Sequence, residues 1–227
     1  MDTLSTGRVA ETLQRLHDEA ARADHALMKS FEGADLHEQM VKLVQREQTE
    51  YREMYRTYAD NFLSVSPQLG RFLYSCVRAC KPTRIVEFGT SMGISAIYMA
   101  CALRDNGGGV LLGTELEPSK AARARENLSA AGLADFLDLR VGDALETLRD
   151  LDAPVDMLLL DGALTLYHPV LKLLEPRLRT GALIIGENAI EGIGPYLEYV
   201  RNPGNGYFSQ PIPFQDARGN EFTVVTR

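Results

Sequence analysis

The sequence predicts an α/β protein whose sheet is doubly wound and mostly parallel. From Lys81 onward, apolar runs of strand length alternate with segments of helix length, and this alternation is typical of right-handed βαβ units. The runs at 157–160 and 182–186 are apolar throughout, as strands buried on both faces require. A chain of 227 residues is long enough to bury such a sheet within one domain.

The first 60 or so residues have a different character. They are rich in charged and polar side chains and contain no proline. Apolar residues recur at helical spacing over 9–16 and again over 36–44. We therefore expect two or three amphipathic helices in this part of the chain, with a break at 32–35.

The rest of the chain predicts seven strands and four more helices. Ser66 followed by Pro67 is typical of a helix cap and first turn, so the first of these helices begins there. The expected strands are 84–88, 110–114, 137–141, 157–160, 182–186, 208–214 and 221–226, and the expected helices are 67–79, 93–103, 118–131 and 167–178. The last two strands flank a turn-forming segment at 215–220 and are expected to form an antiparallel hairpin. We expect one domain over 1–227, with a core at 61–227 and a helical extension at 1–60 that acts as a substrate cover or dimer contact.

Composition and charge exclude several classes of protein. Hydrophobic residues make up 45% of the chain and charged residues 24%, which is ordinary for a globular domain and too apolar for a disordered one. The formal net charge of −7 disfavours nonspecific nucleic-acid binding, which needs a surplus of Lys and Arg. No apolar run has the length of a membrane span. We therefore expect a cytoplasmic protein without a nucleic-acid or membrane partner. Oligomers of this size are usually twofold dimers, so we also expect a homodimer.

The first predicted strand ends in a glycine loop. Gly89 and Gly93 allow a ligand to approach the backbone closely, and the helix that follows offers free N–H groups to an anion. The spacing differs from the Gly-x-Gly-x-x-Gly pattern of dinucleotide-binding proteins, which disfavours an NAD-dependent dehydrogenase. Taken alone, the loop is also compatible with an ordinary tight turn between a strand and a helix.

Acidic residues follow the next two predicted strands. Glu115, at the end of the second strand, is suited to bind both hydroxyls of a ribose, or to lie in solvent near a helix start. Asp143, after the third strand, is suited to accept a hydrogen bond from an adenine amine, or to cap the helix that begins at Ala144. Three such signals at the ends of three successive strands favour a nucleotide-like ligand.

These signals together resemble a known family. The order and spacing of Glu87-x-Gly89, Glu115, Gly142-Asp143 and Asp161 are similar to those of class I S-adenosylmethionine-dependent methyltransferases. The stretches RIVEFGTSMGISAIYMA and LLGTELEPSKAARARENLSAAGL resemble, within that class, the small-molecule O-methyltransferases related to catechol and caffeoyl-CoA O-methyltransferase. The resemblance covers about residues 60–227 and implies a Rossmann-like methyltransferase fold.

The resemblance also implies S-adenosyl-L-methionine as the cofactor. In that arrangement the Gly89–Gly93 loop faces the methionine part, Glu115 holds the ribose and Asp143 lies by the adenine. The cofactor-binding residues expected on this basis are Val65, Ser66, Glu87, Gly89, Thr90, Ser91, Gly93, Ser95, Glu115, Leu116, Gly142, Asp143, Ala144 and Asp161.

The fourth and fifth predicted strands end in residues that could bind a metal. Asp161, Glu187 and Asn188 carry oxygen ligands, which suit Mg²⁺ or Ca²⁺ better than zinc. The resemblance implies Mg²⁺ ligands of the types Asp, Asp and Asn, so Glu187 keeps a carboxylate with one more methylene. We expect Asp161 to take part in catalysis as well, and a metal-free site stays open as the alternative.

The general base is the main departure from the family. The resemblance implies Lys three residues after Asp161, and this sequence has Leu164 there. A metal-bound phenolate would need little help from a base. His168 is the other candidate, because its unperturbed pKa suits proton transfer near neutral pH.

The interpretation we favour is an O-methyltransferase that acts on a small aromatic or vicinally hydroxylated metabolite, of the kind made in secondary metabolism. Two alternatives keep the same fold. The protein could bind S-adenosylmethionine and methylate nitrogen or catalyse a rearrangement without methyl transfer, or it could be a binding module without catalysis.

Overall fold

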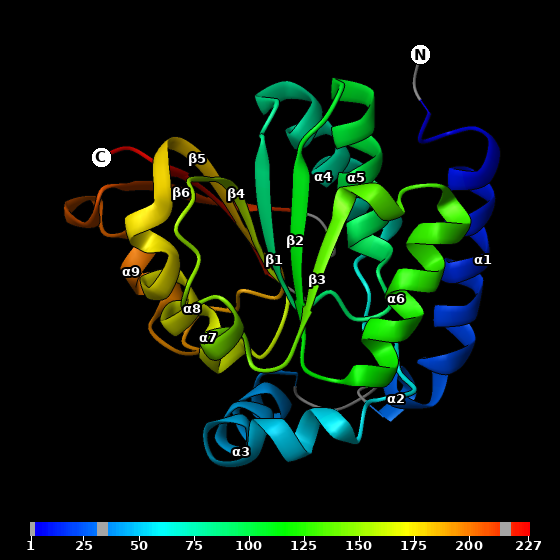
Figure 1. Cartoon of the computed structure of the whole chain (residues 1–227). Coiled ribbons are helices and arrows are strands. Elements are labelled where there is room, and N and C mark those ends of the chain that lie inside the picture. The colour runs from blue at the N-terminus through cyan, green and yellow to red at the C-terminus, as the bar shows by residue number, and fades with distance from the viewer. Residues whose placement is uncertain (1–2, 31–35, 214–218) are drawn as a thin grey trace.

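The computed structural model describes residues 3–30, 36–213 and 219–227. The described residues form seven strands, which are β1 (Arg84–Phe88), β2 (Val110–Glu115), β3 (Leu137–Val141), β4 (Val155–Leu160), β5 (Leu178–Gly186), β6 (Tyr207–Ile212) and β7 (Asn220–Val225). They make one sheet in the order β3-β2-β1-β4-β5-β7-β6 (Figure 1). β1 to β5 are parallel, and β7 is antiparallel to both β5 and β6. The predicted doubly wound sheet with a C-terminal hairpin is confirmed.

Helices cover both faces of the sheet (Figure 1). One face carries α4 (Pro67–Cys80), α5 (Ile94–Asn106) and α6 (Pro118–Ala131), and the other carries α7 (Ala144–Thr147), α8 (Tyr167–Leu174) and α9 (Tyr196–Arg201). Each face has its own cluster of buried apolar side chains. Because β4 lies at the centre of the sheet, all six of its residues are buried, which explains its apolar sequence.

The N-terminal 60 residues contribute three helices, as expected: α1 (Gly7–Ala23), α2 (His25–Ser30) and α3 (Leu36–Arg56). α1 packs against α5 and α6 and buries Leu13 and Leu16 in the cluster on that face. α3 instead lies across the carboxyl ends of the strands, below the sheet in Figure 1, and is kinked at Glu50. The extension therefore has two parts: α1 packs on one face of the sheet, whereas α2 and α3 lie at the edge where ligands bind in such sheets.

The ends of some predicted elements are different in the structure. The helix expected at 167–178 ends at Leu174, and a 3₁₀ turn at Glu175–Arg177 leads directly into β5. Pro176 explains this, since it has no N–H to donate and its ring clashes with the carbonyl four residues earlier. The predicted break at 32–35 and most of the predicted turn at 215–220 lie outside the described residues.

None of the helices that the structure describes combines the length with the apolar character that a membrane span requires.

Gly89 shows how closely β1 and β4 approach at the edge of the sheet. Its φ is +94°, and a Cβ atom built on it would lie 2.2 Å from the carbonyl oxygen of Asp161. Gly107 has the same φ of +94°, with no atom within 4 Å of a Cβ atom built there. A substitution at Gly107 would therefore test backbone strain alone, whereas the same substitution at Gly89 would add a steric clash.

We expect Gly89→Ala to destabilise the protein more than Gly107→Ala. Strain at positive φ alone should cost about 1 kcal/mol at Gly107, and the clash with backbone should add roughly 1–3 kcal/mol at Gly89. Urea unfolding of both variants measures the two costs. Equal costs would show that the edge of the sheet relaxes to accept the methyl group.

Candidate active site

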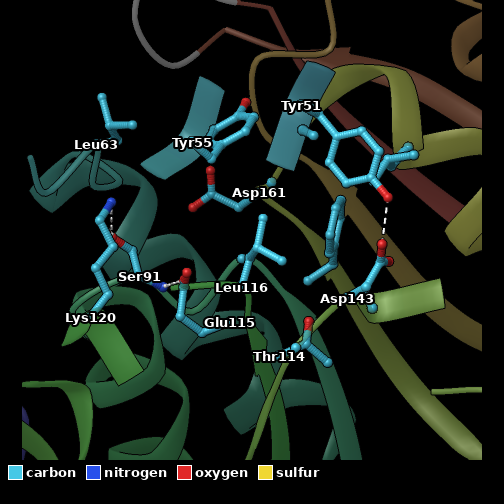
Figure 2. A pocket seen from close by; sticks show the side chains of 17 residues that line it. Tyr51, Tyr55, Leu63, Ser91, Thr114, Glu115, Leu116, Lys120, Asp143 and Asp161 are labelled. Carbon is cyan, nitrogen blue, oxygen red and sulfur yellow. Dashed lines mark hydrogen bonds between the residues drawn. The ribbon is translucent and has the colours of Figure 1, made fainter. Parts of the chain in front are cut away.

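A pocket of about 660 Å³, partly open to solvent, lies at the carboxyl ends of β1, β2, β3 and β4 (Figure 2). We call it the strand-end pocket. The end of the sheet forms its floor, and α3 supplies the opposite wall through Tyr51 and Tyr55. The lining residues are Tyr51, Tyr55, Leu63, Phe88, Gly89, Ser91, Thr114, Glu115, Leu116, Lys120, Gly142, Asp143, Ala144, Asp161, Gly162, Ala163 and Leu166.

The loop after β1 forms one side of this pocket. The N–H groups of Gly89 and Thr90 donate to the carbonyl of Thr114 at 3.2 and 2.9 Å, which holds the loop against the end of β2. The N–H of Ser91, a residue with φ of +49°, donates to the Glu115 carboxylate at 2.7 Å. The loop and the acidic residue of β2 therefore form one hydrogen-bonded unit.

Glu115 is held rigidly within the pocket. Its Oε2 accepts from the N–H of Ser91, and its Oε1 accepts from the N–H of Glu117 at 2.8 Å. The side chain is buried, and burial raises the pKa of Glu115 in spite of the backbone hydrogen bonds that oppose this shift. Each carboxylate oxygen has a second lone pair, so Glu115 can accept two further hydrogen bonds from a ligand.

Lys120 is a pocket residue that the sequence analysis did not identify. It is 5% exposed on the first turn of α6, and its Nζ donates to the Ser91 hydroxyl at 3.4 Å. Burial lowers the pKa of Lys120, while nearby Glu115 acts in the opposite direction. It is the one Lys or Arg among the described residues that line the strand-end pocket. The signal that could have found it is its position five residues after Glu115.

Asp143 has two structural roles. Its Oδ1 caps α7 by accepting from the N–H of Leu145 at 3.0 Å. Its Oδ2 accepts from the Tyr51 hydroxyl and from the Arg52 guanidinium at 2.7 and 3.0 Å. Burial alone would raise the pKa of Asp143, but the hydrogen bonds from Tyr51 and Arg52 lower it overall. The capping role that the sequence left open is present, together with a contact to α3 that it did not predict.

Glu47 fixes the other half of α3 and was also missed by the sequence analysis. This carboxylate is 0% exposed. It accepts from the Tyr55 hydroxyl at 2.7 Å and from the N–H of Thr165, just beyond β4, at 2.9 Å. Burial raises the pKa of Glu47 against these hydrogen bonds. Glu47 therefore joins α3 to the end of β4, while Asp143 joins it to the end of β3.

A second pocket of about 930 Å³, also partly open to solvent, lies between α2, α3 and the strand ends. We call it the Met-rich pocket. It shares Tyr55, Leu63, Asp161 and Gly162 with the strand-end pocket, so the two are neighbours across Asp161. Its lining residues are Leu27, Met28, Met40, Leu43, Met54, Tyr55, Tyr58, Leu63, Asp161, Gly162, Leu164, Asn188 and Ile190.

The three predicted metal ligands lie at neighbouring strand ends. Asp161 and Asn188 line the Met-rich pocket, whereas Glu187 is buried and lines neither pocket. The Tyr167 hydroxyl donates to the backbone carbonyl of Glu187 at 2.7 Å. Burial raises the pKa of Tyr167, and the carboxylates of Asp161 and Glu187 act in the same direction. The buried Oδ1 of Asn188 has no hydrogen-bond partner among the described residues. Those residues contain no group of three or more His, Cys, Asp or Glu able to hold a metal.

The other predicted cofactor residues divide into three groups. Leu116, Gly142 and Ala144 line the strand-end pocket, while Thr90 and Ser95 line a smaller pocket of about 220 Å³ beyond the glycine loop. The remaining four line neither of these pockets in the part of the chain that the structure describes: Ser66 caps α4, Gly93 caps α5, and Val65 and Glu87 are buried.

His168 is not brought to either pocket. It lies on α8 with its ring 4.9 Å from that of Tyr199, measured between centroids. Burial and the nearby Lys172 ammonium lower the pKa of His168. Leu164, by contrast, lines the Met-rich pocket.

Comparison with known proteins identifies the family. Residues 86–189 match a family described as a methyltransferase domain. Catechol O-methyltransferase of Sus scrofa is 32% identical over 151 residues, which cover 63% of this chain and 80% of that protein. The chain belongs to the class I O-methyltransferase family that includes catechol O-methyltransferase.

Other members of this O-methyltransferase family extend the likeness. Catechol O-methyltransferase of Niastella koreensis is 36% identical over 132 residues, which cover 56% of this chain and only 59% of that relative. Among solved structures, the O-methyltransferase TomG of Streptomyces achromogenes, in complex with SAM, has a TM-score of 0.67 and 26% identity. That alignment covers 92% of this chain and 99% of TomG.

The buried carboxyl of Glu87 should make the stability of the protein depend on pH. It is 0% exposed and accepts a hydrogen bond from Ser95, and burial raises its pKa to about 7. Because this value is above that of an unfolded glutamate, the contribution of Glu87 to stability is present in acid and is lost as the pH rises through the folded pKa.

We expect the free energy of unfolding of Glu87→Gln, relative to the parent, to fall by on the order of 3 kcal/mol between about pH 8 and about pH 5. Glutamine mimics the protonated acid, so the variant should lack this pH dependence. Denaturant unfolding at several pH values measures the difference, with Glu126→Gln, at an exposed position on α6, as the control. A pH-independent difference would mean that Glu87 does not titrate in this range.

Proposed function

We propose that the protein is an S-adenosylmethionine-dependent O-methyltransferase that acts on a small aromatic or vicinally hydroxylated molecule. The observation that carries the proposal is the order of charged groups in the strand-end pocket. Lys120 lies at one side, Asp143 at the other and Glu115 between them, with Asp161 opposite Glu115 (Figure 2). A ligand with a carboxylate, a diol and an amino-bearing base in that order would match this arrangement.

Lys120 and Glu115 would make the main polar contacts to the cofactor. Lys120 would pair with the carboxylate of its methionine part, since it is a buried cation on the loop side of the pocket. Glu115 would accept from the two ribose hydroxyls with its remaining lone pairs. The adenine would lie near Tyr51 and Asp143, where Leu116 and Ala144 add apolar surface.

The cofactor, when bound, supplies a methyl group on an already activated sulfonium. The chain then has to align the acceptor oxygen with the methyl group and exclude water. Asp161 and Tyr55 line both pockets, so they are the residues that would face the acceptor and the cofactor together. The acceptor would occupy the Met-rich pocket, with its hydroxyl toward Asp161.

A divalent metal would fit the oxygen ligands that follow β4 and β5. Asp161, Glu187 and Asn188 offer oxygen ligands of the type that Mg²⁺ prefers, and the unpartnered buried Oδ1 of Asn188 supports the fit. These three residues would hold the ion, which would orient two vicinal oxygens of the acceptor and lower the pKa of the hydroxyl that attacks.

The test combines binding with turnover. Calorimetric titration with S-adenosylhomocysteine should give binding that is weakened roughly 10–100-fold by Glu115→Ala and at least about tenfold by Lys120→Met, because each loses a charge-assisted contact. Asp161→Asn should bind normally and lower methyl transfer to catechol at least about 100-fold.

Arg123→Met is the matched control for Lys120→Met. Arg123 lies one turn further along α6, is exposed and pairs with Glu19, so its removal should leave binding unchanged. Absence of binding in the parent would refute the cofactor assignment. Binding of S-adenosylhomocysteine without methyl transfer to any acceptor would favour a binding module. Methyl transfer that is insensitive to EDTA would refute the proposed metal site.

A further inference from the structure

The Met-rich pocket has one polar wall and one apolar wall. Asp161 and Asn188, from the strand ends, are its polar side chains besides the phenols of Tyr55 and Tyr58. Among the described residues, the wall that α2 and the first half of α3 supply consists of Leu and Met, namely Leu27, Met28, Met40 and Leu43. All four are half-buried, so part of their apolar surface stays accessible. A ligand is one way to cover apolar surface of this kind.

No described residue that lines this pocket is Lys, Arg or His. The segment 31–37, whose side chains the structure does not describe, contains no Lys or Arg and one histidine, His37. The charge that the lining does contain is the negative one of Asp161. An anionic group buried in the pocket would therefore lose its hydration without gaining a counter-ion.

The cations of α3 are all engaged elsewhere. Lys42 pairs with Glu38 and Arg46 with Glu50, and these four side chains are exposed. Arg56 pairs with Glu53 in the same way. Arg52 pairs with Asp143 beside the strand-end pocket. The Lys and Arg side chains of α3 are thus paired outside the lining of the Met-rich pocket, to which α3 presents methionine and leucine.

We propose that the acceptor is an uncharged molecule with an apolar substituent, which enters the Met-rich pocket while its hydroxyl group meets Asp161 and Asn188. This inference rests on the proposed O-methyltransferase function and adds the class of acceptor to it. The pocket selects against acceptors that carry a carboxylate or a phosphate. The methionine side chains, which are flexible and polarisable, suit apolar substituents of more than one shape.

The selection on charge can be tested with a matched pair of acceptors. 3-(3,4-Dihydroxyphenyl)propanoate and its methyl ester share one skeleton and differ in charge. In the parent protein we expect kcat/KM for the ester to exceed that for the acid by at least about 100-fold, because the acid must be buried without a counter-ion. In a series of 4-alkylcatechols, each buried methylene should raise kcat/KM roughly fourfold until the pocket is filled.

Two variants at one position of the apolar wall separate charge from shape. Met40→Lys adds a cation of similar length and should reduce the preference for the ester to about tenfold or less. Met40→Gln adds polarity without charge and should keep the parent's ratio between ester and acid. An unchanged ratio in Met40→Lys, with the Gln variant as its control, would contradict the role of charge in this pocket.

Binding gives a readout that does not depend on methyl transfer. Titration of ester and acid into the protein saturated with S-adenosylhomocysteine should show the same preference in Kd. If the ester binds preferentially and neither compound is methylated, the proposed reaction fails while the assignment of the pocket stands. If the acid binds as tightly as the ester, or the alkyl series is flat, the inference is overturned even where methyl transfer occurs.

Discussion

The buried carboxylate of Glu47 is the contact on which the rest of the site depends. It holds α3 to the end of β4 through the Tyr55 hydroxyl and the N–H of Thr165. Without α3, the strand-end pocket would lose its wall opposite the sheet, and the Met-rich pocket would lose much of its apolar lining. A carboxylate that is 0% exposed is costly to bury, so these hydrogen bonds have to compensate for its lost hydration.

Five acidic residues lie at the strand ends, but they are not equivalent. Glu115, Asp143 and Asp161 line the strand-end pocket, whereas Glu87 and Glu187 are buried and do not. Burial raises the pKa of Glu47, Glu87 and Glu115, whereas hydrogen bonds from Tyr51 and Arg52 lower the pKa of Asp143. In the proposed reaction a sulfonium cation would enter this acidic setting, with Lys120 reserved for the one carboxylate of the cofactor.

The core of the fold could be predicted because its signals are local. The predicted ranges 84–88, 118–131 and 137–141 coincide with β1, α6 and β3, since apolar strands and proline and glycine boundaries are encoded within each segment. The common location of Glu115, Asp143 and Asp161 could also be predicted, because the carboxyl ends of parallel strands lie at the same edge of a sheet.

What could not be predicted depends on long-range packing. Glu47 and Thr165 are 118 residues apart, and nothing near Glu47 in the sequence indicates that it will be buried. From the sequence, Lys120 would be predicted to be a solvent-exposed lysine in the first turn of a helix. In the structure it is buried and contacts the Ser91 hydroxyl. His168 was considered from its residue type alone, and in the structure its ring lies beside that of Tyr199, outside the described lining of both pockets.

Hydrogen exchange in Glu47→Ala tests most directly whether this carboxylate holds α3 over the strand ends. Glu53→Ala is the matched control, because Glu53 lies on the same helix, is exposed and pairs with Arg56. The account predicts that Glu47→Ala speeds exchange in α3 and around Thr165, with β1 and β2 unchanged, and that Glu53→Ala does much less. If exchange in α3 were the same in both variants as in the parent, Glu47 would not be what holds the helix in place.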